Sequence, residues 1–213
     1  SERVIRFLDN IDPDGIAEII ESHSLSEVGF VVVSKSGRTA ETMGALAMIE
    51  EALADEGLTL PERSVAITLK GSALDKRAEG EGWLGTLALW DWVGGRTSLT
   101  SAVGLLPAAL AGIDGESVLE GAAHMDAWTR EASLSDNPAM ALALSWYQAT
   151  EGQAKRAQVV LPYADRLRLL APYLQQLVME SLGKAVDREG KAVHQGLTLY
   201  GNKGATDQHA YVQ

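Results

Sequence analysis

The 213-residue sequence contains no cysteine. It therefore has no disulfide framework, no thiolate nucleophile and no metal site built on cysteine. The cytoplasm is the default location for a chain of this kind, and we expect the protein to be cytoplasmic.

Positive charge is also scarce. Eighteen Lys and Arg residues stand against 29 Asp and Glu, which gives a formal net charge of −11. A nucleic-acid-binding protein needs a basic stripe to neutralise phosphates along a strand, and the sequence shows none. We therefore expect no nucleic-acid partner.

Long apolar runs are missing as well. The longest, at 102–113, is interrupted by Pro107 and falls short of the roughly 20 residues that a membrane helix needs. Near Ser1 no basic segment is followed by an apolar one, so we predict neither a secretory signal nor a membrane partner. The composition, 46% hydrophobic and 22% charged, is that of a globular protein with a core.

Apolar runs alternate with amphipathic segments along the chain. The run at 28–33 is typical of a strand buried on both faces of a parallel sheet. Further strands are predicted at 3–8, 64–69 and 158–161, with a third apolar element opening at 87–92. Helices are predicted at 39–53, 116–130, 139–149 and about 167–184. This alternation predicts an α/β layered sandwich. Turn formers at 133–138 mark the expected boundary to a second unit.

The first candidate site is the polar turn between the strand at 28–33 and the helix that follows. Its residues are Ser34, Lys35, Ser36, Gly37, Arg38 and Thr39. The unpaired amides and positive dipole of a helix amino terminus favour an anion, and three hydroxyls add hydrogen-bonding groups. An ordinary capped turn would look similar, but ligands bind at the carboxyl ends of strands in open α/β sheets. We therefore favour a phosphate site here.

Three weaker signals accompany it. Gly94 and Gly95 precede Arg96, and such a pair permits close approach of the backbone while the guanidinium can bind an oxyanion. Helical spacing places Gln176, Glu180 and Lys184 on one stripe, which a surface ion pair would also explain.

The third signal is His209, which can move protons near neutral pH, although a lone histidine is more often structural. No other histidine stands at ligand spacing from it, so we predict no metal site. A match to the dinucleotide glycine pattern at 80–85 is rejected because the charged residues before it cannot form the required strand.

Together these segments resemble the glucose-6-phosphate isomerase family, whose members are built from two sugar-isomerase (SIS) domains. The resemblance is carried by WDWVGGRTS at 90–98, GAAHMDAW at 121–128, LPYADRL at 161–167 and QQLVMESLGK at 175–184. It implies a three-layer α/β/α sandwich with a parallel sheet. It also implies a first SIS domain at 1–132, lacking its amino-terminal part, and the opening part of a second at 133–213.

The resemblance also implies roles for the candidate residues in interconverting glucose 6-phosphate and fructose 6-phosphate, a step of glycolysis and gluconeogenesis. The sugar phosphate would be held by Ser34, Lys35, Ser36 and Thr39. Gly95 and Arg96 would face the reacting carbons, where the arginine stabilises an enediolate. Glu180 would be the base, Gln176 would line the pocket, and His209 would open the sugar ring from the neighbouring subunit of a homodimer. No cofactor or metal is implied.

The resemblance further implies that the chain is an internal fragment, which we expect to have little or no activity in isolation. A non-catalytic sugar-phosphate regulator would keep the hydroxyls of the turn without needing Arg96, Glu180 and His209. An isomerase that also accepts mannose 6-phosphate is the other alternative.

Overall fold

The computed structural model describes residues 3–152 and 154–212. The chain divides into two compact units, Ser1–Glu120 and Gly121–Gln213, which we call the amino-terminal and the carboxy-terminal unit. This division falls inside one helix. The predicted boundary between residues 132 and 133 concerns the two SIS domains and stays a prediction.

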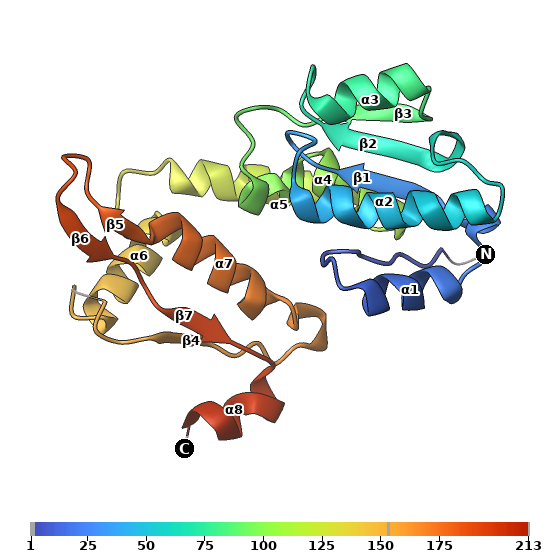
Figure 1. The fold of residues 1–213 in the computed structure, drawn as a ribbon. Coiled ribbons are helices and arrows are strands. Elements are labelled where there is room, and N and C mark those ends of the chain that lie inside the picture. Colours follow the sequence, from blue (N-terminus) through green and yellow to red (C-terminus); the bar gives the residue numbers. More distant parts are fainter. Residues whose placement is uncertain (1–2, 153, 213) are drawn as a thin grey trace. The chain divides into compact units, whose positions relative to one another are not determined.

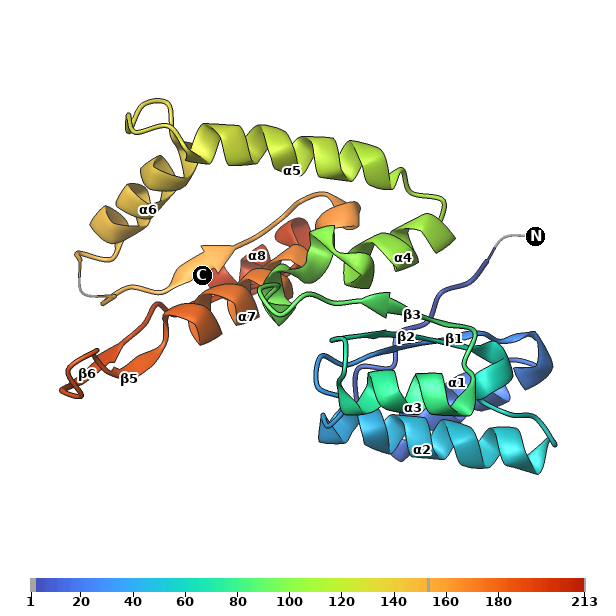
Figure 2. The same cartoon turned by 90° about the horizontal axis from the view of Figure 1, so that it is seen from above.

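The amino-terminal unit is built on a parallel sheet with the strand order β1-β2-β3. Its strands are β1 (Phe30–Val33), β2 (Ser64–Thr68) and β3 (Gly85–Ala88). Its helices are α1 (Pro13–Glu21), α2 (Ala40–Asp55), α3 (Ala73–Glu81) and α4 (Ala102–Leu110), with 3-10 turns at Leu25–Glu27, Pro61–Arg63 and Gly95–Thr100. Figure 2 shows α2 and α3 on one side of the sheet and α4 on the other.

The two faces of this sheet carry two apolar cores. Val32 and Ala66 pack with residues of α2 and α3, among them Leu46. The neighbouring positions in the strands point the other way, and Ile67 packs with Leu106 of α4. This alternation follows from the two-residue repeat of a strand. The predicted three-layer α/β/α sandwich with a parallel sheet is confirmed.

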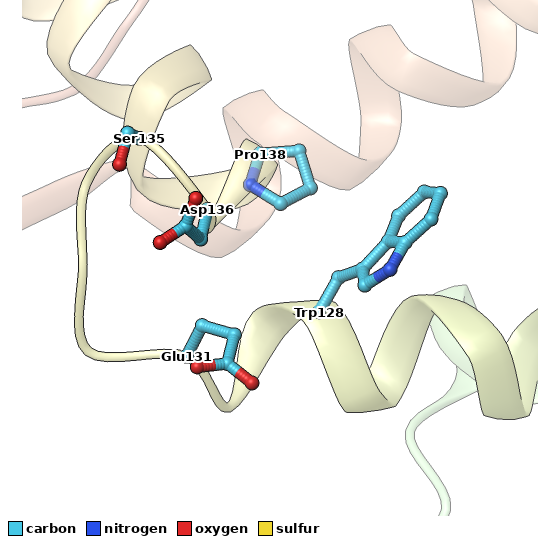
Figure 3. Close-up of a pocket in the computed structure, with 5 residues that line it drawn as sticks. All are labelled: Trp128, Glu131, Ser135, Asp136 and Pro138. Atoms are coloured by element: carbon cyan, nitrogen blue, oxygen red, sulfur yellow. The ribbon is translucent and has the colours of Figure 1, made fainter.

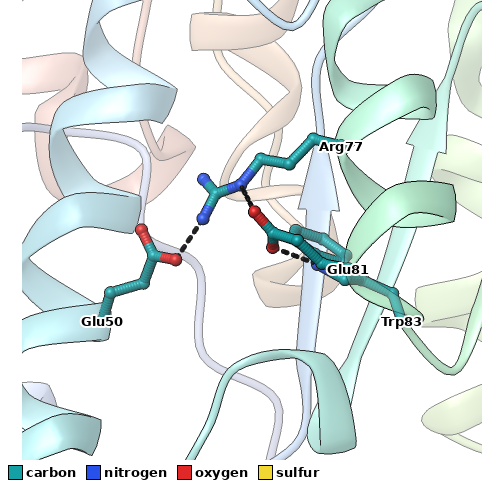
Figure 4. A network of polar contacts seen from close by, with 4 residues as sticks. All are labelled: Glu50, Arg77, Glu81 and Trp83. Carbon is teal, nitrogen blue, oxygen red and sulfur yellow. Dashed lines mark hydrogen bonds and ion pairs between the residues drawn. The ribbon is translucent and has the colours of Figure 1, made fainter.

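A polar network ties α2 to α3 on their shared side of the sheet (Figure 4). Arg77 of α3 forms an ion pair with Glu50 of α2 and donates from Nε to Glu81 Oε1 at 2.8 Å. The indole of Trp83 donates to Glu81 Oε2 at 2.9 Å, and the Arg77 guanidinium lies 5.8 Å from its ring centroid. The network therefore fixes the helix that precedes β3.

The carboxy-terminal unit contains two small two-stranded sheets. Helix α5 (Gly115–Thr129) leads into it, followed by α6 (Pro138–Ala149), β4 (Gln158–Val160), a 3-10 turn at Asp165–Leu167, α7 (Leu170–Leu182), β5 (Lys184–Val186), β6 (Ala192–Gln195), β7 (Leu199–Gly201) and α8 (Gly204–Val212). Strand β4 pairs in parallel with β7, and β5 forms an antiparallel hairpin with β6. Helix α7 packs against β7, as Figure 1 shows.

Most predicted elements are present. The predictions at 28–33, 39–53, 64–69, 116–130, 139–149 and 158–161 correspond to β1, α2, β2, α5, α6 and β4. The apolar element expected to open at 87–92 is β3, which begins earlier, at Gly85, and ends at Ala88. The rejection of the glycine pattern is also confirmed, because the residues before it form α3, which ends at the left-handed Gly82.

One prediction of regular structure is wrong, and one predicted helix is present with narrower bounds. Residues 3–8 do not form a strand. An extended segment becomes a strand only by pairing with a neighbour, and Val4 and Phe7 of this one are 65% and 72% exposed. The helix expected over 167–184 begins at Leu170 and ends at Leu182, because Gly183 adopts an extended conformation. Lys184 therefore lies outside the helix that carries Gln176 and Glu180.

Within the described stretches of chain, no helix combines the length and the apolar character that a membrane crossing requires.

Candidate functional site

The turn at 34–39 lies at the carboxyl end of β1 and leads into α2. Ser34 is buried, and its hydroxyl accepts a hydrogen bond from the Gly37 amide at 3.0 Å. The same hydroxyl lies 3.1 Å from Thr39 Oγ1, while Ser36 Oγ accepts from the Arg38 amide at 3.1 Å. The three predicted phosphate-binding hydroxyls thus belong to one hydrogen-bonded turn.

Gly37 makes this turn possible. Its φ is +68°, a left-handed conformation that residues with a side chain adopt at a cost. A Cβ at this position would lie only 2.3 Å from the Leu74 amide nitrogen in α3. The turn therefore approaches α3 so closely that only glycine fits.

The backbone of the turn is attached to the end of β2. The Ser34 amide donates to the Ile67 carbonyl at 3.2 Å, and Thr68 Oγ1 donates to the Ser34 carbonyl at 2.6 Å. Thr39 precedes α2 but does not cap it with its hydroxyl. The first amides of a helix have no partner within the helix, so the start of α2 offers donors to an anion.

Lys35 connects the turn to a second loop. Its Nζ donates to the main-chain carbonyls of Asp91 at 2.5 Å and Val93 at 3.0 Å. That loop continues into Gly95 and Arg96, which begin a 3-10 turn just before α4. The structure therefore brings two of the predicted segments together at the carboxyl end of the sheet.

Arg96 is partly buried within this 3-10 turn. The turn is held by main-chain and hydroxyl contacts: the Thr97 amide donates to the Gly94 carbonyl at 3.1 Å, and Ser98 Oγ donates to the Gly95 carbonyl at 2.7 Å. Ser101 caps the next helix, α4, because its hydroxyl accepts from the Val103 amide. Arg96 thus belongs to a short segment after β3 that is held by contacts within it.

In the carboxy-terminal unit, Gln176 and Glu180 lie one turn apart on α7. Gln176 Nε2 donates to Glu180 Oε2 at 3.3 Å, and both side chains are exposed. They help to line a depression of about 410 Å³, formed by Pro172, Gln175, Gln176, Met179 and Glu180. This contact can orient the Glu180 carboxylate, which is accessible to a ligand.

Lys184 takes part in neither contact. Its ammonium donates to the carbonyls of Ser181 at 2.8 Å and Gly183 at 3.0 Å, just after α7 ends. A cation at this end of a helix satisfies carbonyls that have no partner within the helix. Lys184 therefore closes α7, and the predicted stripe with Gln176 and Glu180 is wrong because the helix stops before it.

His209 lies exposed on α8, which is docked on the segment after β4. Tyr163 Oη donates to Gln208 Oε1 at 2.6 Å, and Lys203 forms an ion pair with Asp165 at 2.5 Å. The hydrogen bond and charge of Lys203 lower the pKa of Asp165. From the sequence alone, the segment 161–167 and His209 are treated separately. The parallel pairing of β4 with β7 brings their downstream segments together.

A second depression, of about 520 Å³, lies between the end of α5 and the start of α6 (Figure 3). It is lined by Trp128, Glu131, Ser135, Asp136 and Pro138. None of the predicted site residues lines it. In the described part of the chain, no three acidic or histidine side chains gather as metal ligands.

The amino-acid sequence of the chain was compared with models of known protein families. The family model for phosphoglucose isomerase matches residues 1–213. The chain belongs to the phosphoglucose isomerase family.

Its relatives in this family are close in sequence. A glucose-6-phosphate isomerase from Citrifermentans bemidjiense is 54% identical over 211 residues, which cover 98% of this chain and 40% of that protein. The chloroplastic glucose-6-phosphate isomerase 1 of Arabidopsis thaliana is 52% identical and is covered to 34% of its length. The chain thus spans well under half of the curated relatives it matches.

A solved structure of the same family confirms the fold. The glucose-6-phosphate isomerase of Chlamydia trachomatis matches 97% of this chain with a TM-score of 0.87 and 34% identity, and 40% of that structure is covered. The predicted site residues are divided between the two units of the chain. Ser34, Ser36, Thr39, Lys35, Gly95 and Arg96 lie in the amino-terminal unit, and Gln176, Glu180 and His209 lie in the carboxy-terminal unit.

Proposed function

We propose that the protein containing this chain interconverts glucose 6-phosphate and fructose 6-phosphate. The observation that carries the proposal is the match of the phosphoglucose isomerase model to the whole chain, with relatives of that activity more than 50% identical. The turn at 34–39 supports it independently, because its hydroxyls and the start of α2 suit a phosphate group.

In this proposal, Ser34, Ser36 and Thr39 hold the phosphate, and Lys35 lies beside them. The phosphate is remote from the bonds that change, so its binding energy serves to orient the sugar. The attachment of the turn to β2 supports this role, because a fixed set of donors loses little freedom when the ligand binds.

Glu180 acts as the base that moves a proton between the first and second carbons of the open-chain sugar. Carbon acids beside a carbonyl are weak, so the carboxylate must be held in place and the enediolate oxygen stabilised by fixed charge. Gln176 supports the first requirement through its hydrogen bond to Glu180. Arg96 supplies the second, with Gly95 allowing the backbone to approach the reacting carbons.

His209 opens the sugar ring, reaching the site from the neighbouring subunit of a homodimer. The exposure of His209 on a docked helix supports this part of the proposal, because a histidine that acts on another subunit must lie on the surface. Neither a metal ion nor a nicotinamide is needed for the proton transfer.

The test uses the protein expressed at its full natural length, in a coupled assay that converts fructose 6-phosphate to glucose 6-phosphate. Glu180→Gln should lower kcat by a factor between about a hundred and ten thousand, the usual contribution of a general base. It should abolish solvent exchange of the proton on the second carbon while the affinity for sugar phosphate is kept.

Glu189→Gln, in the hairpin between β5 and β6, removes the same charge from an exposed position and should leave turnover unchanged. Binding of sugar phosphate without turnover by the wild type would instead indicate a regulator. Wild-type proton exchange in Glu180→Gln would remove Glu180 from its role. Turnover of mannose 6-phosphate in addition to glucose 6-phosphate would indicate an isomerase that accepts both sugars.

A further inference from the structure

We infer that Lys35 is a positioning residue, which holds the loop carrying Gly95 and Arg96 against the turn at 34–39. The inference rests on the proposed function and deepens it. The position of Lys35 within the turn suggests that its ammonium group contacts the phosphate directly. The geometry points to a different use for its ammonium group, which is bound to the main chain of another loop.

The contacts of the ammonium are specific. Lys35 Nζ donates to the Asp91 carbonyl at 2.5 Å and to the Val93 carbonyl at 3.0 Å, 56 and 58 positions along the chain. Backbone carbonyls outside regular structure need donors, and a charged donor forms the stronger kind of hydrogen bond. Two such bonds direct the ammonium to one place on this loop.

Both ends of this connection are anchored. On the side of the turn, the Lys35 carbonyl accepts from the Leu69 amide at 3.3 Å. On the side of the loop, Val93 is buried and packs with Ile67 and Leu89. Between this buried anchor and Arg96 there are only two residues, both glycines, which restrain the backbone least. The Lys35 contacts therefore restrict the loop just before its most flexible point.

This arrangement links phosphate binding to the position of the guanidinium. A displacement of a reacting or stabilising group by about 1 Å can cost two orders of magnitude in rate. Loss of the Lys35 donors should therefore lower kcat by about ten- to a hundredfold. A lysine that contacts phosphate directly would instead weaken the binding of phosphate itself.

The experiment compares Lys35→Met with Lys76→Met in the protein at its full natural length. Lys76 is exposed on α3, so the control removes the same charge from the same unit. The two measurements are kcat and the inhibition constant of inorganic phosphate. For Lys35→Met we expect the fall in kcat with an inhibition constant within about threefold of wild type, and for Lys76→Met no change in either.

Amide hydrogen exchange at residues 91–98 gives a readout that does not depend on activity. It should accelerate in Lys35→Met while the amides of β2 stay protected, which also verifies folding. Lys35→Arg keeps a charged donor and should retain slow exchange.

An inhibition constant that rises as much as kcat falls, or unchanged exchange at 91–98, would overturn the inference. If the wild type does not isomerise the sugar phosphates, the proposed function fails, and the exchange measurement still decides whether Lys35 holds the loop.

Discussion

In the amino-terminal unit the candidate site is made largely by main chain and hydroxyls, of which that of Ser34 is buried, whereas in the carboxy-terminal unit Glu180 is exposed on a single helix. The turn at 34–39 is bonded to β2, α3 and the loop after β3. Glu180 has its hydrogen bond from Gln176, one turn away on the same helix. The turn is thus attached to several other elements of its unit, whereas the contact between Gln176 and Glu180 lies within one helix.

Burial follows the same division. Among the described residues, fifteen buried apolar side chains belong to the amino-terminal unit and three, Ala171, Val178 and Leu199, to the other. Anion binding through backbone amides requires a rigid frame, because a shift of the chain moves every donor together. A carboxylate base requires only that one side chain be aimed correctly. A substitution that shifts the backbone of the turn at 34–39 can therefore displace several donors together, whereas one that moves Glu180 affects a single carboxylate.

The largest effect is expected at Gly37, where tertiary packing and backbone conformation coincide. Gly37→Ala forces a Cβ to within 2.3 Å of the Leu74 amide and places alanine at φ +68°. The left-handed conformation alone costs about 1–2 kcal/mol, and the clash adds to it. We expect the free energy of unfolding to fall by about 3 kcal/mol or more, with loss of phosphate binding.

The matched control for this prediction is Gly57→Ala. Gly57 has a φ of +71° but nothing within 4 Å of the added Cβ, so it isolates the conformational cost. Denaturant unfolding and phosphate titration of both variants measure the difference. Equal losses in the two variants would show that close packing of the turn on α3 is unimportant.

The next effect is expected in the carboxy-terminal unit at Asn137. This buried side chain caps α6 by accepting from the Met140 amide, and it donates to the carbonyls of Thr129, the last residue of α5, and Glu131. Asn137→Ala should cost about 1–3 kcal/mol, because a cap is lost and two partly buried hydrogen bonds to carbonyls are lost with it. Asn202→Ala, at an exposed position, should cost little by the same unfolding measurement. Similar costs for both variants would mean that Asn137 does not join the two helices.

The two units also differ in how they hold a carboxylate. Hydrogen bonding by the Gly71 amide, helped by Lys70, lowers the pKa of the buried Asp75 below its ordinary 3.8. In the carboxy-terminal unit, the hydrogen bond and charge of Arg130 lower the pKa of the exposed Asp126. A lowered pKa means that the stabilisation is present above pH 3.8 and is lost as the pH falls below it.

Asp75→Asn and Asp126→Asn test this contrast. Each variant should be less stable than wild type at neutral pH, and each difference should shrink as the pH falls below 3.8. Added salt should reduce the difference for Asp126, because exposed ion pairs are screened, and should affect Asp75 less. The measurement is denaturant unfolding at several pH values and two salt concentrations. Equal salt dependence of the two stability differences would contradict the contrast between the buried Asp75 and the exposed Asp126.

The sequence is informative where one local pattern decides the structure. The apolar run at 28–33, the polar turn and Thr39 predicted β1, the turn and α2, because each signal lies within a few residues of its effect. The strand predicted at 3–8 is absent, since an extended segment becomes a strand only by pairing with a neighbouring strand. The predicted place of Lys184 on the helix is wrong because α7 ends at Leu182, two residues before it.

Long-range partners are beyond such patterns. The acceptors of Lys35 lie more than fifty positions away and are backbone carbonyls, which every residue possesses, so no residue type marks them. The contact between Tyr163 and Gln208 likewise depends on the pairing of β4 with β7. The residue types of the candidate site could be read from the sequence, but the contacts that hold them could not.

The smallest effect is expected at Tyr163. Tyr163→Phe removes the hydroxyl that donates to Gln208 but keeps the ring that packs on Gly204. We expect a loss of about 0.5–1 kcal/mol, since a single exposed hydrogen bond contributes little and the ion pair of Lys203 with Asp165 remains.

The loss should appear locally, as amide exchange in α8 that is about two- to fivefold faster, because this free energy corresponds to that ratio in the opening equilibrium. Tyr147→Phe removes a hydroxyl from another exposed tyrosine of the same unit and should leave α8 unchanged. If α8 exchanges at the wild-type rate in Tyr163→Phe, the other contacts of the helix hold it, among them those of Lys203 with Asp165 and of the Gly204 amide with the Pro162 carbonyl. The orientation of His209 would then not depend on the hydrogen bond between Tyr163 and Gln208 in the middle of α8.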